Sequence, residues 1–571
     1  MKILLVAVNA KYIHSNLAVY NLRAYAKAYL KSDVQIEIAE YTINHQMDDI
    51  LAGVYKAKPD VLCFSCYIWN LPCVEAVSCE YHKLCPAVPI WVGGPEVSYE
   101  TERFLKEHPQ MTGVMIGEGE QTFLELCALY AECDTRPNGM YKKPAGIAYR
   151  RGEEICFTAA REPIDMSTIP FCYDDITDFT NRIIYYESSR GCPFRCSYCL
   201  SSVEKQLRFR DIALVKNELS FFLEKRVPQV KFVDRTFNCN HAHAMEIWSF
   251  LKEHDNGVTN FHFEISADLL TEEELALLAG MRKGLVQLEI GVQSTNGATI
   301  GEIHRTMDLT RLKAVVRRIQ ETGNIHEHLD LIAGLPYEGY MTFAKSFDEI
   351  YALKPNQLQL GFLKVLKGSY MYEHSVEYGL IYQSRPPYEV LRTNWLDFPE
   401  LLAIRRAEEM LEVYYNSGQY EVTVKLLETQ FFSAFAMFES MGAFYEKQGY
   451  FGMSHSRVRR AEILLEFAEE SAPAAVPMLK ESLVFDLYYR ENLGKRPAWA
   501  GELSEWKELT RKYCKNGKQS HVERFFYRFP GKETRTVTKL PEREEKACYV
   551  LFDYTARDPL DHQAAYRYLD E

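Results

Sequence analysis

The sequence predicts an α/β protein: a doubly wound (Rossmann-like) domain, a partial (βα)6 barrel, and a mainly helical C-terminal region ending in a small antiparallel sheet. Two observations support this fold. Short apolar runs alternate with helical segments in two successive series, and the end of the chain alternates apolar and polar residues. A chain of 571 residues fits three or four domains of roughly 150 residues each. We place the parts at residues 1–140, 141–181 (a linker), 182–370 and 371–571.

The first series predicts a parallel sheet, because its strands are separated by helices long enough to cross over. Such sheets bind ligands beyond the carboxyl ends of their strands. The linker is rich in Pro and Gly and contains an apparent hairpin at 147–157. The expected strands of the first series lie at 2–8, 34–41, 60–69, 88–94 and 113–120.

The second series contains six strands, too many for an extension of the first sheet. It predicts a barrel whose site lies at the carboxyl ends of the strands. Those strands are expected at 182–189, 229–234, 261–266, 285–292, 325–334 and 358–365. The small C-terminal sheet is expected to use 521–529, 534–540 and 548–554.

Composition excludes several classes of protein. The chain has 66 basic and 79 acidic residues, and its net charge of -13 argues against broad nonspecific binding to nucleic acid or membranes. No apolar run approaches the ~18 residues of a membrane span. The N-terminal MKILLVAVNAKY predicts a strand rather than a signal peptide, so we expect a cytoplasmic protein with no membrane partner. We therefore expect its 15 cysteines not to form disulfides.

The strongest motif is a CxxxCxxC formed by Cys192, Cys196 and Cys199, directly after the first strand of the second series. Thiolates are soft ligands that hold iron–sulfur clusters. Three buried structural cysteines or a zinc knuckle are the alternatives. Zinc usually needs four ligands, and no second CxxC or His pair follows at suitable spacing. The motif therefore favours an iron–sulfur cluster as the metal centre.

This loop resembles the signature of the radical S-adenosylmethionine (SAM) family. The resemblance implies a [4Fe-4S] cluster on the three cysteines and a fourth iron that binds SAM. It also implies that SAM is cleaved reductively to methionine and a 5′-deoxyadenosyl radical, with electrons from a low-potential donor such as flavodoxin or ferredoxin.

Further segments resemble the SAM contacts of that family, in the expected order along the barrel. Asp234 stands where many members carry Gly-Gly-Glu, which is absent here, so Asp234 is our candidate for the methionine amino contact. Gly334 lies in DLIAGLP, which resembles the fifth-strand segment beside the adenine. The SAM contacts implied by the resemblance are Tyr198, Asp234, Glu264, Ser266, Glu289, Gln293, Ser294 and Gly334.

The N-terminal domain resembles the cobalamin-binding domain fused to many radical SAM enzymes. Glycines after its strands let backbone approach a nucleotide tail and a corrin closely. The Asp-x-His-x-x-Gly motif that ligates cobalt elsewhere is missing, so the expected state is base-off and His-off, with Tyr67 near cobalt. A nucleotide-binding domain is the alternative, but no GxGxxG follows the first strand. The implied cobalamin contacts are Asn9, Lys11, Ser65, Tyr67, Gly93, Gly94, Gly117, Glu118 and Gly119.

The resemblance implies a cobalamin-dependent radical SAM enzyme that modifies an unactivated carbon, by methyl transfer through methylcobalamin. A non-methylating enzyme acting on a tRNA nucleoside, as in a queuosine-type reduction, is one alternative. A cobalamin sensor with a structural cluster is another. The substrate is a small molecule or tRNA: the basic, aromatic stretch 507–539 would suit RNA, although such runs are commonly solvated faces.

Overall fold

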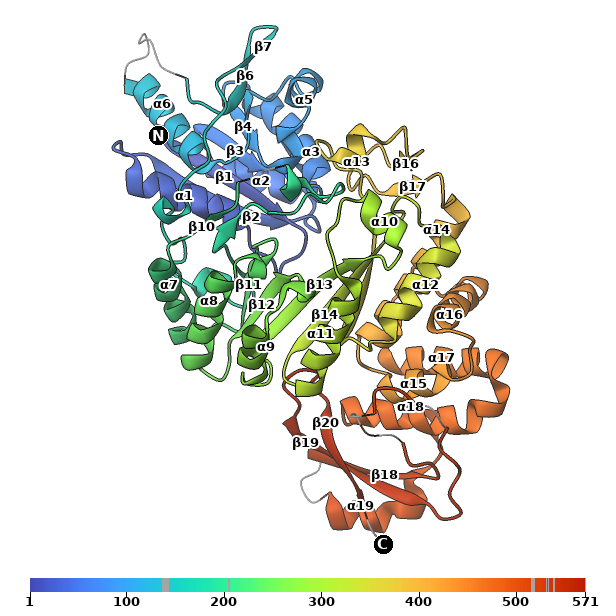
Figure 1. Cartoon of the computed structure of the whole chain (residues 1–571). Coiled ribbons are helices and arrows are strands. Elements are labelled where there is room, and N and C mark those ends of the chain that lie inside the picture. Colours follow the sequence, from blue (N-terminus) through green and yellow to red (C-terminus); the bar gives the residue numbers. More distant parts are fainter. Residues whose placement is uncertain are drawn as a thin grey trace. The chain divides into compact units, whose positions relative to one another are not determined.

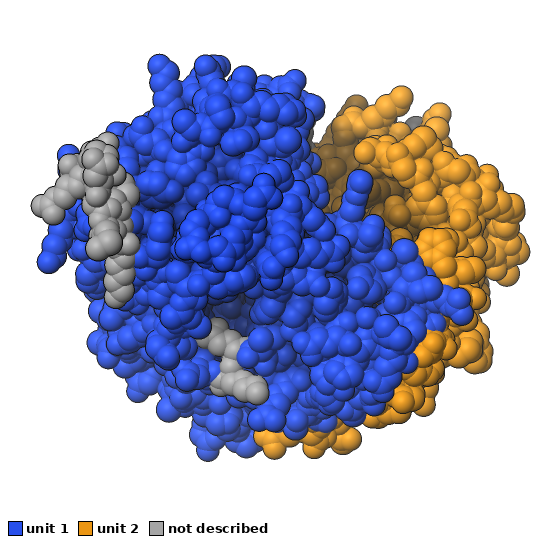
Figure 2. All heavy atoms as spheres, turned by 90° about the horizontal axis from the view of Figure 1, so that it is seen from above, with its two compact units in different colours: residues 1–288, 301–307, 363–393 blue, residues 289–300, 308–362, 394–571 orange. Residues whose placement is uncertain are grey.

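The computed structural model describes residues 1–135, 143–203, 206–514, 519–529, 531, 534–537 and 540–569. It divides into two compact units, coloured separately in Figure 2. Unit 1 comprises residues 1–288, 301–307 and 363–393, and unit 2 comprises 289–300, 308–362 and 394–571.

Unit 1 opens with a seven-stranded sheet in the order β2-β1-β3-β4-β5-β6-β7 (Figure 1). Its first five strands are parallel, as predicted. They are β1 (Lys2–Asn9), β2 (Gln35–Thr42), β3 (Val61–Ser65), β4 (Ile90–Gly93) and β5 (Gly113–Met115). The helices between and after them are α1 (Leu17–Tyr29), α2 (Met47–Ala57), α3 (Leu71–Leu84), α4 (Pro95–Ser98), α5 (Thr101–Glu107) and α6 (Glu120–Thr135).

The hairpin in the predicted linker belongs to this sheet. Strand β6 (Ile147–Arg151) pairs antiparallel with β5, placing Ala148 opposite Val114, and β7 (Glu154–Phe157) follows it. Ala148 is fully buried and packs in the same core as Val92 and Val114. The hairpin therefore covers the β5 edge instead of only crossing the surface, because an open sheet edge leaves backbone donors and acceptors unpaired.

Unit 1 also contains the first three strands of the barrel, parallel and in the order β12-β11-β8. A short antiparallel pair, β9 and β10, follows β8. The elements are β8 (Ile184–Tyr186), β9 (Ser189–Arg190), β10 (Arg208–Phe209), α7 (Ile212–Glu224), β11 (Gln229–Phe232), α8 (His241–Glu253), β12 (Asn260–Ile265) and α9 (Glu272–Ala279). The return segment 363–393 adds α13 (Tyr370–Glu373), β16 (Ile381–Tyr382) and β17 (Val390–Arg392).

In unit 2, the other predicted barrel strands lie in the order β15-β14-β13. They and their helices are β13 (Val286–Gln293), whose last five residues belong to this unit, α10 (Gly297–Glu302), whose first four residues belong to it, α11 (Leu309–Thr322), β14 (His326–Ala333), α12 (Tyr340–Tyr351) and β15 (Gln357–Phe362). The structure thus contains all six predicted βα strands.

The C-terminal region is helical and then forms a three-stranded antiparallel sheet, as predicted. Its order is β18-β19-β20, so the third strand is the segment 564–569, and the prediction of a strand at 534–540 was wrong for its described residues. Residues 538–539 lie outside the described residues. The elements are α14 (Phe398–Leu411), α15 (Glu421–Glu428), α16 (Ala434–Gln448), α17 (Arg457–Ser471), α18 (Val476–Arg490), α19 (Lys507–Tyr513), β18 (Ser520–Phe525), β19 (Cys548–Arg557) and β20 (Ala564–Leu569).

Within the described ranges, no helix combines the length and apolar character needed to cross a membrane.

Candidate active site

The three motif cysteines lie on one loop whose base is the β9–β10 pair. Arg190 is opposite Arg208, and Ser189 is opposite Phe209, so the loop from 191 to 207 is closed like a hairpin. Gly191 has a φ of +97°, and a Cβ there would come within 2.4 Å of the Gln206 carbonyl oxygen. Only glycine therefore allows the loop to close at this point.

The thiols of this cysteine loop are free and partly to fully buried. Burial raises the pKa of Cys192, while the Phe194 backbone N–H and the Thr236 hydroxyl, 3.8 Å from its sulfur, lower it. Zn–S bonds of about 2.3 Å would hold sulfur atoms roughly 3.8 Å apart. Among the described residues, the three sulfurs do not all lie within 4.8 Å of one another.

Arg305 is a site residue that the sequence analysis missed. Its Nη1 lies 3.8 Å from the Cys196 sulfur. Burial alone would lower the pKa of Arg305, but Tyr198 and Cys196 raise it above its usual value, so the guanidinium stays charged. The preceding turn is tied to the loop, since the Ser197 N–H donates to the Ile303 carbonyl at 2.9 Å. No local motif marks Arg305, because only the folded chain brings residues 301–307 beside the cysteines.

Asp234, the candidate amino contact, binds the segment that precedes the cysteine loop. It is 1% exposed. Its Oδ1 accepts hydrogen bonds from the hydroxyls of Ser188 (2.7 Å) and Ser189 (2.6 Å), and its Oδ2 accepts one from the Ser188 N–H (3.0 Å). The Ser188 hydroxyl proton is donated to Asp234, so the Nε2–H of His243 must donate to Ser188 Oγ, 3.0 Å away. Burial lowers the pKa of His243 to about 4, which keeps this ring neutral.

The buried Asp234 should produce a measurable pH dependence of stability. Burial raises its pKa from 3.8 to about 6, so ionisation destabilises the folded state. The favourable contribution of Asp234 to the free energy of unfolding is fully present below pH 3.8. It is lost as pH rises through about 6, a change of about 3 kcal/mol. We expect the free energy of unfolding of the wild type, relative to Asp234→Asn, to fall by most of that amount between pH 4 and 7 in chemical denaturation.

The matched control is Asp175→Asn, which removes an exposed carboxylate that accepts hydrogen bonds from Thr177. The pKa of Asp175 is lowered by Thr177, so the wild type should gain stability relative to this variant as pH rises. If the difference in the free energy of unfolding between the wild type and Asp234→Asn did not change with pH, the raised pKa of Asp234 would be contradicted.

The predicted cobalamin contacts gather at one edge of the first sheet. Asn9 ends β1, Ser65 ends β3, Gly93 ends β4, and Gly117 follows β5. These strands are parallel, so their carboxyl ends meet at the same edge. The placement agrees with the predicted site, while the role of each residue stays a prediction.

The glycines of this edge differ in what surrounds them. Gly94 has a φ of +123°, and a Cβ there would meet the Cys66 carbonyl oxygen at 2.4 Å. Glycine is therefore required at position 94 by the protein's own backbone. Gly117 has a φ of +73°, with nothing within 4 Å of a Cβ. Its surroundings are open, so Gly117 is the better position for probing a bound ligand.

Other predicted contacts at this edge already have partners in the protein. The Asn9 amide donates to Glu40 Oε1 at 2.9 Å, and the Asn16 amide donates to Ser65 Oγ at 3.0 Å. His14, in the first loop, is 2.7 Å from the Tyr185 hydroxyl. Lys11 is exposed.

The loop after β3 presents two aromatic rings. Tyr67 and Trp69 stack with their centroids 4.4 Å apart and their planes 6° from parallel. Burial raises the pKa of Tyr67 to about 12, and the charge of Glu187 adds to this effect while Arg235 opposes it. Tyr67 thus lies near charged groups that follow β8 and β11, and its phenol stays neutral at physiological pH.

Ser266 follows β12 and is held by its own neighbours. Its backbone N–H donates to Asn238 Oδ1 at 3.0 Å, and its hydroxyl donates to Asp268 at 2.7 Å. Glu264 lies on β12 itself.

In unit 2, Gln293 carries a buried acceptor that suits a ligand. It has a φ of +72°, and its buried Oε1 has no hydrogen-bond partner among the described residues. An unsatisfied buried acceptor is costly, so this atom suits a ligand hydroxyl or amine. Ser294 instead donates to Glu338 Oε1 at 2.6 Å, and burial raises the pKa of Glu338 to about 7.

Two further SAM candidates lie on or after the strands of unit 2. Glu289, on β13, has a ligand atom within 4.8 Å of those of His328 and Asp330 on β14. Gly334 follows β14 with a φ of +88°.

Three arginines of the basic C-terminal stretch contact the protein itself, whereas Lys507, Arg511 and Lys512 are exposed. The Arg524 guanidinium lies 4.8 Å from the Trp506 ring centroid, Arg528 donates to Glu544 at 2.9 Å, and Arg535 donates to the Gln320 carbonyl at 2.7 Å. These contacts are typical of a folded surface. Lys515, Lys518, Lys532 and Lys539 lie outside the described residues.

Comparison with known families agrees with this geometry. The B12 binding domain model matches residues 3–127, and the Radical SAM superfamily model matches residues 186–350. The chain therefore carries a B12-binding domain followed by a radical SAM domain, as the sequence predicted. Residues 376–549 match a protein family of unknown function, DUF4080.

Individual relatives are distant. The cobalamin-dependent radical SAM methyltransferase TokK of Streptomyces tokunonensis is 26% identical over 50% of this chain and 44% of its own length. The 2-(S-pantetheinyl)-carbapenam-3-carboxylate methyltransferase of Streptantibioticus cattleyicolor is 26% identical over 52% of this chain and 45% of its own. The chain spans under half the length of these relatives. The cobalamin-dependent SAM radical enzyme OxsB shares the fold, with a TM-score of 0.57 and 16% identity over 85% of this chain and 80% of its own.

Proposed function

We propose that this protein is a cobalamin-dependent radical SAM enzyme that transfers a methyl group to an unactivated carbon of a small molecule. One observation carries the proposal. Arg190, on the strand that leads to Cys192, pairs with Glu118 in the loop after β5, at 3.1 Å, and with Glu120 at the start of α6, at 2.7 Å. The carboxyl edge of the B12-binding domain therefore lies against the base of the cysteine loop within one compact unit.

The residues of this chain suit the [4Fe-4S] cluster, cobalamin and SAM. Cys192, Cys196 and Cys199 would hold a [4Fe-4S] cluster as soft thiolate ligands. Cobalamin would occupy the open edge around Gly117, and Gln293 Oε1 would accept a hydrogen bond from SAM. When bound, these groups supply reductive cleavage of SAM and a transferable methyl group. The chain itself supplies binding, orientation and shielding from water, with Arg305 as a fixed cation beside Cys196.

Methyl transfer is supported by the names of the two relatives described above, which are methyltransferases. A tRNA substrate is less well supported, because Arg524, Arg528 and Arg535 each contact the protein. We therefore favour a small-molecule substrate.

The test is anaerobic incubation of reconstituted protein with hydroxocobalamin, methyl-deuterated SAM and a low-potential reductant. Small-metabolite extracts and total tRNA serve as separate substrate arms. We expect 5′-deoxyadenosine to form and deuterated methyl to appear by mass spectrometry in the metabolite arm. Formation of 5′-deoxyadenosine without label transfer would favour the non-methylating alternative, and absence of both would favour the cobalamin sensor.

A further inference from the structure

The base of the cysteine loop carries two like charges at directly opposed positions. Arg190 of β9 is the cross-strand partner of Arg208 of β10. Like charges opposite one another destabilise a strand pair. Both side chains are mostly buried, at 17% and 16% exposure, so solvent screens this repulsion only in part.

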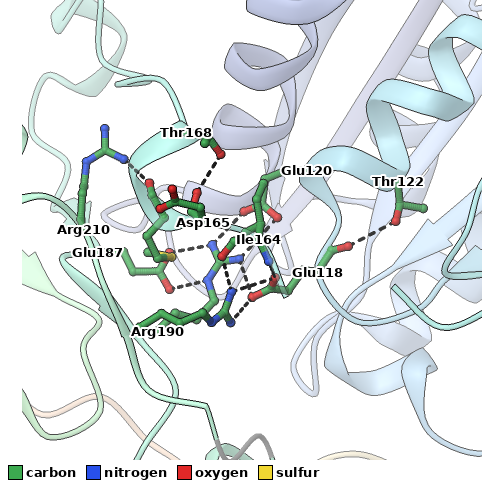
Figure 3. A network of polar contacts seen from close by, with 11 residues as sticks. Glu118, Glu120, Thr122, Ile164, Asp165, Thr168, Glu187, Arg190 and Arg210 are labelled. Atoms are coloured by element: carbon green, nitrogen blue, oxygen red, sulfur yellow. Dashed lines mark hydrogen bonds and ion pairs between the residues drawn. The ribbon is translucent and has the colours of Figure 1, made fainter. Parts of the chain in front are cut away.

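A single carboxylate of the B12-binding domain bridges these two arginines. Glu118 Oε1 lies 3.1 Å from Arg190 Nη1, and Glu118 Oε2 accepts a hydrogen bond from Arg208 Nη1 at 3.1 Å. Glu118 Oε2 also accepts the Ile164 N–H at 2.8 Å. Glu118 is 16% exposed, and although burial opposes the shift, the two arginines hold its pKa below the usual value. Figure 3 shows Arg190 among Glu118, Glu120 and Glu187.

We infer that Glu118 is a positioning residue that clamps the base of the cluster loop through Arg190 and Arg208. This role goes beyond the cobalamin contact predicted for Glu118, since its side chain is turned toward the β9–β10 pair. The inference rests on the proposed function for one readout only, the reduction potential of the bound cluster. Glu120 and Glu187 also bind Arg190, at 2.7 and 2.8 Å, whereas Glu118 binds both Arg190 and Arg208 and so bridges the two strands.

The neutral isostere Glu118→Gln leaves the two guanidinium groups facing each other without the bridging charge. We expect amide hydrogen exchange in residues 188–209 of the full-length protein to accelerate about tenfold, because removing one partner of a buried ion pair is strongly destabilising. The reduction potential of the bound cluster should become less negative, because lost negative charge nearby favours the reduced form.

The double variant Glu118→Gln/Arg208→Gln removes the opposed charge as well and should restore both readouts toward the wild type. The matched control is Glu125→Gln, which breaks an ion pair of the same domain with Arg161, at 2.7 Å, that does not touch β9 or β10. Glu125→Gln should change neither quantity.

Exchange in Glu118→Gln that equals that of the wild type, or an equal change in Glu125→Gln, would overturn the clamp. Failure of the double variant to restore exchange would also overturn it, since the effect would not depend on the opposed arginines. Hydrogen exchange is measured with and without the cluster. A wild type that binds no iron would therefore refute the proposed function while still testing the clamp.

Discussion

Replacing Cys192, Cys196 or Cys199 with alanine should remove most of the iron from anaerobically purified protein, which is expected to hold about four irons per chain. The three thiols lie on one loop, free and partly to fully buried. Each is expected to bind a different iron, so the loss of any one leaves an iron open to solvent. Iron analysis and the brown visible absorption of the cluster measure the loss.

Cys239→Ala is the matched control for these variants. Cys239 is also free and half-buried, and it lies close enough to Cys192 that their charges would interact, yet it stands outside the motif. It should retain full iron content. Full iron in each of the three single motif variants would refute the ligand assignment, and strong iron loss in Cys239→Ala would show that the motif is not the whole ligand set.

Gly117→Leu should abolish stable binding of added hydroxocobalamin through desalting. A Cβ at Gly117 meets no protein atom within 4 Å, so the side chain should enter open space at the predicted corrin edge rather than disrupt packing. Gly94 is unsuitable for this purpose, because a Cβ there would clash with the Cys66 backbone. Visible absorption of the desalted protein measures bound cobalamin, and the wild type should show a base-off spectrum.

Gly152→Leu controls for backbone strain in this experiment. Gly152 has a similar φ of +63° and equally open surroundings, in the β6–β7 turn. Its variant should pay the same conformational cost and still bind cobalamin. Wild-type binding by Gly117→Leu, or equal loss in Gly152→Leu, would contradict a corrin site at the loop after β5.

Strands and helices whose own residue pattern identifies them could be predicted from the sequence. The buried parallel strands of both series are apolar runs in the sequence, and the helices between them predicted that the strands are parallel. Both predictions were confirmed. Strand pairing at sheet edges was not predictable in the same way. The hairpin 147–157 joins β5, and β20 replaces the expected 534–540 strand, because edge pairing depends on which backbone groups are brought together.

Some residues of the candidate site are identified by a local motif, and others are brought together only by the fold. The CxxxCxxC motif is local, and three thiols with this spacing point to a cluster before any fold is known. Arg305 has no such signature, and it reaches Cys196 only because the chain returns to the loop from more than 100 residues away. Asp234 and Glu118 were identified by position, but their partners Ser188 and Arg208 come from other segments of the chain.

The sequence by itself therefore determined the class of this protein: two βα series, a cysteine loop after the first barrel strand, and glycines at the carboxyl edge of the first sheet. These features depend on periodicity and short spacing, which the order of residues contains directly. Only the tertiary structure decided what buried charged groups do. A carboxylate without bound partners would be too costly to bury, and its partners are whichever donors the fold brings within about 3 Å. Asp234 thus supports the strand end at Ser188, and Glu118 bridges Arg190 and Arg208.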